Sequence, residues 1–354
     1  AAVIIIKGSP EFFQRRWKPA VETVSIGIQN LYAPCNCACK YCLLQSCKKA
    51  EGVEYYRGKK IAERLVCWAK EKGLTNLPYY GISYCAEYPE LFDNILFNAS
   101  IGFSGANFLQ CNGLAIRSEP ETDDLIKKLK AAGITKIDTT FYGDEEYHDR
   151  FAARTGDFGF MLLLANSAVR NGIICSPSVV ISEENKAQLD DLFNILVRVT
   201  DISCIHSFLP DLRGRGFLME DSRLTKNSYE MLSDQVKSTI NIKRYKSESE
   251  WLSIGKLPEY SKRALIITLR EENIDMFENM ACDEIIAYVE KLDDEYYRVI
   301  PAINELAEMY GDKNNMKLYR LRDLFWMWQK RYIQDNHIDI YDVTDERYCH
   351  TVRS

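Results

Sequence analysis

The sequence has no apolar run approaching the roughly 20 residues of a membrane span, and it has no internal repeat or low-complexity linker. It also has no excess of basic residues. The 45 Lys and Arg are outnumbered by 51 Asp and Glu, which gives a formal net charge of −6. Because phosphate binding requires a basic surface, this balance argues against a nucleic-acid partner. We therefore expect neither a nucleic-acid nor a membrane partner.

Cysteine is too sparse for a disulfide-stapled secreted domain, with 12 in 354 residues, and no signal peptide is recognisable at the start. Free thiols of this kind are typical of a reducing compartment, so a cytoplasmic location is expected. The segment Gly-Ser-Pro-Glu-Phe at 8–12 looks like a cloning scar. Residues 1–20 are accordingly expected to be a tag or a disordered terminus, outside the fold.

Four of the cysteines nevertheless crowd into eight residues, namely Cys35, Cys37, Cys39 and Cys42. Thiols this close together cannot all pair as disulfides without strain, but they can converge on one metal centre. Cys35, Cys39 and Cys42 have the spacing C-x3-C-x2-C. Three ligands would leave one iron of a [4Fe–4S] cluster open to an outside ligand. The alternative is a zinc knuckle using all four thiols, which would be cramped.

Apolar and β-branched segments alternate with helical patterns over about the first 210 residues. Strands are expected at 21–29, 77–84, 106–111, 137–141, 174–181 and 202–208. Helices are expected between them, one of which begins at the capping-box pair Ser118 and Glu121 and ends at Gly133. This alternation predicts an α/β fold with a parallel sheet, here a partial (β/α)6 TIM-like barrel over 21–220. Chemistry should then lie at the C-terminal ends of the strands.

Residues 221–354 have a different character and predict a mostly helical C-terminal region that covers the barrel. One strand is conceivable at 263–269, but no seventh or eighth β/α unit of the same kind is recognisable. The aromatic residues of 318–333 are spaced as a helix packing face.

The cysteine loop directly after a first strand, with Tyr41 before its last cysteine and six β/α units after it, resembles the radical S-adenosylmethionine (radical SAM) superfamily over about 21–216. The likeness is to the peptide-modifying branch without its cysteine-rich C-terminal extension, since only Cys282 and Cys349 follow Arg215. The resemblance implies a [4Fe–4S] cluster on Cys35, Cys39 and Cys42, whose fourth iron is chelated by SAM. Reductive cleavage of SAM would give a 5′-deoxyadenosyl radical that abstracts a hydrogen atom, an oxidoreductase-type chemistry.

The resemblance also implies four cofactor-binding residues. Tyr41 belongs to the cysteine motif, and Glu87 stands where the family has the acid that holds the SAM amino group. Thr140 matches a hydroxyl near the SAM carboxylate, and an arginine suits that carboxylate through its bidentate fork. Arg154 is preferred over Arg150 for this role because Arg150 can pair with acids next to it in the sequence. Glu87 could instead cap the following helix.

Other residues are assigned lesser roles. Cys37 is expected to be a bystander thiol, and His148 a structural turn residue. The loop 209–216 could either line the adenosine or substrate site or close the barrel. Cys282 would return a hydrogen atom to a substrate radical if the C-terminal region folded over the barrel.

The expected function is hydrogen abstraction from a peptide or small-molecule substrate, with an electron donor such as flavodoxin or ferredoxin. One alternative is a small-metabolite mutase, dehydrogenase or lyase of the same superfamily. An alternative of another class is a non-catalytic zinc or iron–sulfur scaffold.

Overall fold

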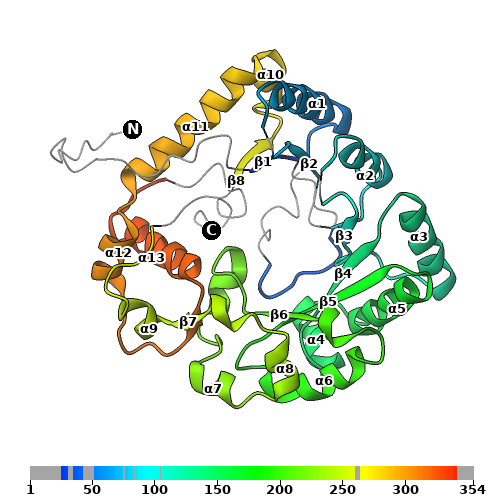
Figure 1. Cartoon of the computed structure of the whole chain (residues 1–354), viewed down its shortest axis with the longest axis vertical. Coiled ribbons are helices and arrows are strands. Elements are labelled where there is room, and N and C mark those ends of the chain that lie inside the picture. The colour runs from blue at the N-terminus through cyan, green and yellow to red at the C-terminus, as the bar shows by residue number, and fades with distance from the viewer. Residues whose placement is uncertain are drawn as a thin grey trace.

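The structure is a computed structural model, which describes residues 25–30, 35–42, 52–74, 76–82, 85–103, 105–259 and 264–340. Its strands follow one another around a ring with helices on the outside (Figure 1). Within these ranges no helix is both long and apolar enough to cross a membrane. The predicted strand at 21–29 and the C-terminal tail lie partly or wholly outside the described residues.

Among the described residues, seven strands of the ring run parallel to their hydrogen-bonded neighbours. They form two sheets, with the orders β2–β1–β8 and β3–β4–β5–β6. The strands are β1 (Ser25–Asn30), β2 (Tyr79–Gly81), β3 (Phe108–Gln110), β4 (Lys136–Phe141), β5 (Ile174–Val180), β6 (His206–Phe208) and β8 (Ala264–Leu269). The predicted α/β class with parallel strands is thus confirmed.

The seventh parallel strand, β8, differs from the six-unit expectation. It pairs with β1 along six residues, from Ser25 opposite Ala264 to Asn30 opposite Leu269. Between β6 and β8 the described residues form short helices, turns and the two-residue strand β7 (Lys246–Ser247), so β8 lacks the regular β/α spacing that marked the other strands. It therefore extends the sheet from the part of the sequence assigned to the C-terminal region.

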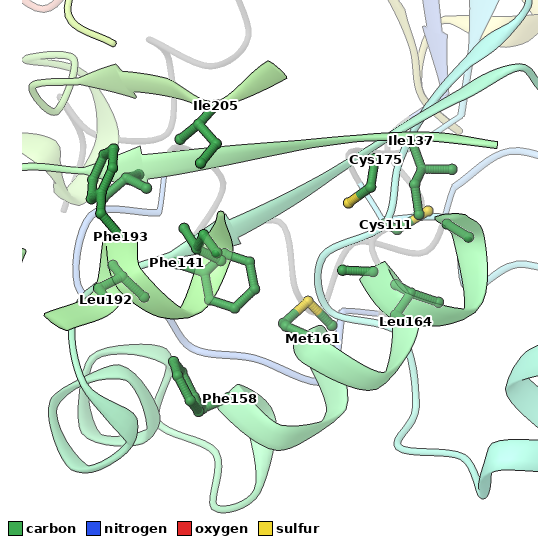
Figure 2. Packing of buried hydrophobic residues seen from close by; sticks show 14 of the residues in the cluster. Cys111, Ile137, Phe141, Phe158, Met161, Leu164, Cys175, Leu192, Phe193 and Ile205 are labelled. Atoms are coloured by element: carbon green, nitrogen blue, oxygen red, sulfur yellow. The ribbon is translucent and has the colours of Figure 1, made fainter. Parts of the chain in front are cut away.

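Helices on the outside of the ring pack against the sheets and bury the outward-facing apolar residues of β1, β4 and β5. The first six are α1 (Tyr55–Glu71), α2 (Leu91–Ser100), α3 (Glu119–Ala131), α4 (Glu145–Ala152), α5 (Asp157–Arg170) and α6 (Leu189–Leu196). Figure 2 shows Ile137 and Phe141 of β4 and Cys175 of β5 packed toward α5. Because side chains alternate along a strand, Asp138 and Thr140 of β4 face the inside of the ring.

Local sequence explains where α3 begins and ends. Ser118 is its N-cap, and Glu121 Oε2 accepts a hydrogen bond from the Ser118 backbone N–H at 2.8 Å. The predicted capping box is therefore present. Gly133 follows the C-cap with φ of +94°, a conformation that glycine adopts at little cost.

The remaining elements are mostly helical. They are α7 (Lys226–Glu230), α8 (Asp234–Ser238), β7 (Lys246–Ser247), α9 (Glu248–Leu252), α10 (Ile274–Asn279), α11 (Cys282–Val299), α12 (Ile303–Tyr310), β9 (Leu318–Tyr319) and α13 (Leu321–Asp335). On α13 the side chains of Phe325, Trp326 and Trp328 are buried in one hydrophobic cluster. The aromatic stripe of this helix is a packing face, as its spacing predicted.

Candidate active site

The cysteine loop, residues 35–42, is fastened to segments that follow other strands of the ring. Its backbone forms hydrogen bonds with three other segments, namely the loop after β3, the end of α4 and the loop after β6. The bonds are Asn36 N to Gly113 O (2.9 Å), Ala38 N to Ala152 O (2.8 Å), Lys40 N to Phe151 O (2.9 Å) and Arg215 N to Cys42 O (2.9 Å). The loop is therefore held at the C-terminal edge of the strands, where barrel chemistry is expected.

The thiols of this loop are all free of disulfides. Cys35, Cys39 and Cys42 are half-buried, and Cys37 is buried. Hydrogen bonds to Cys35 and Cys39, together with burial, raise the pKa of Cys37, so this residue stays a protonated thiol. The hydrogen bond from Cys37 lowers the pKa of Cys39, and the Tyr142 hydroxyl, 3.4 Å from the Cys39 sulfur, acts in the same direction.

Gly113 leaves the space that Cys35 occupies. A Cβ atom at position 113 would lie 2.3 Å from the Cys35 sulfur, and the φ of Gly113 is +76°. The same point is 3.3 Å from the sulfur of Cys85, which follows β2 and is hydrogen-bonded to Cys35. Sequence reasoning missed Cys85, whose only signal was its place two residues before Glu87.

The donor set of the loop fits an iron–sulfur cluster in its chemistry. Three cysteines that form no disulfide stand on one anchored loop, and thiolates are the ligands that such clusters take. Within the described ranges, however, no group of three or more His, Cys, Asp or Glu side chains is arranged so that it could hold one metal ion. The structure alone therefore leaves the ligand assignment of Cys35, Cys39 and Cys42 a prediction.

Glu87 stands two residues after Cys85, the residue hydrogen-bonded to Cys35, and it does not cap a helix. Its Oε1 accepts from Arg117 at 2.6 Å, and its Oε2 accepts from the Ala115 backbone N–H at 2.8 Å. The helix that follows has Glu90 as its N-cap, so the helix-cap alternative for Glu87 is wrong. Burial would raise the pKa of Glu87, but the Arg117 bond and the nearby charge of Arg154 help to hold it below its usual value.

Thr140 is buried on the inner face of β4 near its C-terminal end. Its hydroxyl donates to Asn112 Oδ1 at 3.3 Å, and Asn112 directly precedes the glycine that contacts Cys35. Tyr41 packs its ring against Tyr142 and Phe151, with centroids 5.7 Å away in both cases. Burial raises the pKa of the Tyr41 phenol, which stays protonated.

Arg154 follows α4, and its guanidinium interacts electrostatically with Asp157, Cys37 and Cys35. Its Nε donates to Asp157 Oδ1 at 3.0 Å, its Nη2 bonds the same oxygen, and its Nη1 bonds the Leu114 carbonyl. Arg150, the rejected candidate, is exposed and pairs with Glu146 at 3.5 Å. Sequence reasoning missed Asp157, whose only signal was its place three residues after Arg154.

His148 of α4 is fully buried among the rings of Phe141, Tyr142 and Phe158. Its Nε2 lies 3.1 Å from Asp157 Oδ2. The loop 209–216 contacts the cysteine loop directly, because Arg215 bonds Cys42 O through its backbone and Ala38 O through its side chain. Cys282 lies at the start of α11, where Arg64 and Cys67 of the outer helix α1 influence its thiol. This position on the outer layer does not support its hydrogen-donor role.

No protein-family model matches the chain. No curated protein matches it either. Solved structures do. SuiB of Streptococcus suis bound to S-adenosylmethionine aligns at 14% identity and a TM-score of 0.38, over 53% of this chain and 40% of SuiB. Native anSMEcpe with bound AdoMet and Kp18Cys peptide aligns at 10% identity and a TM-score of 0.47, over 89% of this chain and 98% of that chain.

Coproporphyrinogen III oxidase (HemN) from Escherichia coli, described as a radical SAM enzyme, aligns at 11% identity and a TM-score of 0.39, over 87% of this chain and 90% of HemN. The chain spans only 40–51% of the length of the first four structures it matches. At these identities and TM-scores, no role of a residue follows from the alignments. What the chain is similar to in these comparisons is two structures with bound S-adenosylmethionine and one enzyme described as a radical SAM enzyme.

Proposed function

We propose that this chain is a radical SAM enzyme in which Cys35, Cys39 and Cys42 hold a [4Fe–4S] cluster. The observation that carries the proposal is the anchoring of this C-x3-C-x2-C loop at the C-terminal edge of the parallel strands. A bound, reduced cluster would supply the electron that cleaves SAM to methionine and a 5′-deoxyadenosyl radical. The Tyr142 hydroxyl favours the thiolate of Cys39, the form that binds iron.

The chain's own residues offer matching groups for SAM. Glu87 is an ionised carboxylate that can accept a hydrogen bond from the SAM ammonium. Arg154 uses three of its five N–H donors on Asp157 and Leu114, which leaves two for the SAM carboxylate. The Thr140 hydroxyl lies near the C-terminal end of β4, the edge at which the cysteine loop is held. Tyr41 packs within the hydrophobic cluster that contains Tyr142 and Phe151.

The substrate we propose is a peptide or a small molecule that enters the ring from the same side. The inner face carries polar residues, with Gln110 and His206 exposed and Asp138 half-buried. A polar inner face differs from the apolar side-chain layers that fill a closed barrel. The electron would come from a carrier such as flavodoxin or ferredoxin, and the overall reaction class would be an oxidoreductase or a related radical conversion.

Anaerobic reconstitution with iron and sulfide tests the proposal. We expect about four irons and four sulfides per chain and dithionite-dependent release of 5′-deoxyadenosine. A variant with Cys35, Cys39 and Cys42 all changed to Ala should lose both, while Cys67→Ala, an exposed thiol on α1, should lose neither. Tightly bound zinc without SAM cleavage would instead favour the non-catalytic scaffold and overturn the proposal.

A further inference from the structure

Asp157 is the first residue of α5. Its carboxylate contacts residues of three segments, namely α4, the turn between α4 and α5, and the cysteine loop. Its side chain is 4% exposed, and His148 of α4 approaches its Oδ2 at 3.1 Å. Arg154 binds its Oδ1 through two nitrogens, one of them at 3.0 Å. The sulfur of Cys37, from the cysteine loop, lies 3.7 Å from Oδ2.

The charges decide which partner donates in each contact. Burial would raise the pKa of Asp157, but the hydrogen bonds from His148 and Arg154 hold it below the usual value. The carboxylate is therefore ionised and can only accept. Cys37 must donate its S–H, and His148 must carry a hydrogen on Nε2.

These contacts fix Arg154 in one orientation. Its side chain is 11% exposed, and two donors are held by one carboxylate oxygen while a third meets the Leu114 carbonyl. The cysteines lie close enough for the thiols of Cys37 and Cys35 to influence the guanidinium. A long arginine side chain that is held in place loses less rotamer entropy when it binds an anion.

We infer that Asp157 is a positioning residue of the site, which holds Arg154 toward the SAM carboxylate and fastens the cysteine loop through Cys37. The inference rests on the proposed function for the part that concerns SAM. The part that concerns Cys37 does not depend on SAM or on iron. The two parts can therefore be tested separately on the full chain.

The SAM part is tested with Asp157→Asn in the reconstituted protein, by equilibrium dialysis with SAM. We expect the Kd for SAM to rise about tenfold or more while the iron content per chain stays as in the wild type. In an Arg154→Ala background the same change should have no further effect, because Asp157 acts through Arg154. Asp124→Asn, an exposed carboxylate of α3, is the matched control and should not change the Kd.

The Cys37 part is tested on the purified chain before reconstitution, by maleimide labelling followed by peptide mass mapping. Asp157→Asn should raise the labelling rate of Cys37 about tenfold, and Asp124→Asn should leave it unchanged. If Asp157→Asn does not fold, Cys37→Ala and Cys37→Ser decide the matter. Loss of the donor in Cys37→Ala should lower the urea midpoint of the chain before reconstitution, and the serine hydroxyl of Cys37→Ser should restore it.

Three results would overturn the inference: unchanged SAM affinity in Asp157→Asn, an equal loss with and without Arg154, or unchanged labelling of Cys37. A wild-type chain that takes up iron but binds no SAM contradicts the proposed function and removes the arginine's role. In that case the labelling result alone decides whether Asp157 positions the loop.

Discussion

Asp138 provides a test of the inner face of the ring, because its charge should oppose folding at neutral pH. It lies on β4 between Ile137 and Thr139 and faces inward. Ser178 Oγ donates to its Oδ2 at 3.0 Å, while Oδ1 is buried with no hydrogen-bond partner in the described part of the chain. Burial raises the pKa of Asp138 to about 6 from an ordinary 3.8, against the opposing effects of Ser178 and Lys136.

The direction of the pH effect follows from this rise. Since the folded-state pKa lies above the unfolded-state pKa, the folded chain binds the proton more tightly. The contribution of Asp138 to the free energy of unfolding therefore becomes more favourable as pH falls through 6, and this gain is complete below about pH 4. A rise from 3.8 to about 6 corresponds to about 3 kcal/mol at 1.36 kcal/mol per pKa unit. Because the residue as a whole is only half-buried, screening by solvent should reduce the effect to about 2 kcal/mol.

The assay is urea unfolding of the wild type and of Asp138→Asn at several pH values between 4 and 8. The amide cannot titrate, so any constant packing cost of the substitution cancels when the difference is followed against pH. We expect the difference in unfolding free energy to move in favour of the wild type by about 2 kcal/mol as pH falls from 8 to 4. A difference that stays level, or that moves the other way, would refute the reasoning.

Two further substitutions test the supports of the cysteine loop. Gly113→Ala should reduce iron uptake on reconstitution because its Cβ displaces Cys35. The control Gly133→Ala shares the positive φ but meets no atom within 4 Å, so it should cost only about 1 kcal/mol of stability and take up iron normally. Equal iron uptake in the two variants would contradict the role of Gly113. Asp211→Asn should lower the unfolding free energy by about 3 kcal/mol at neutral pH in urea titrations, because it removes the charge of a carboxylate that pairs with three arginines, two of them buried. Asp124→Asn should cause no measurable change, and a loss below about 1 kcal/mol for Asp211→Asn would refute this.

Much of the fold could be predicted because its signals are local. The capping box of Ser118 and Glu121 and the glycine stop at Gly133 involve neighbours in sequence, and the structure confirms both. The pairing of β8 with β1 joins residues more than 230 positions apart. Nothing in the composition of 263–269 states which strand it would meet, so the seventh strand could be suspected but not placed.

The site divides in the same way. The spacing of Cys35, Cys39 and Cys42 is visible in the sequence, and so is the acid at Glu87. The carboxylate that holds Arg154 is three residues away, yet its importance comes from His148 and Cys37, which converge on it only in three dimensions. The role of Asp157 depends on its burial and on its contacts with His148 and Cys37. The residues next to Asp157 in the sequence indicate neither.

The C-terminal half bears on the cysteine loop through a chain of contacts. Asp211, in the loop after β6, accepts from Arg320 and from Arg322 of α13, the latter at 3.0 Å. Burial would raise the pKa of Asp211, but the arginines hold it far below the usual value, so the carboxylate stays charged.

The turn that follows Asp211 is tight. A Cβ at Gly216 would lie 1.9 Å from the Asp211 carbonyl oxygen, and the adjacent Arg215 N–H bonds the carbonyl of Cys42. Weakening the Asp211 cluster should therefore loosen the last cysteine of the motif as well as α13. This coupling makes the C-terminal helix a structural part of the site, although it contributes no group to the chemistry that we propose.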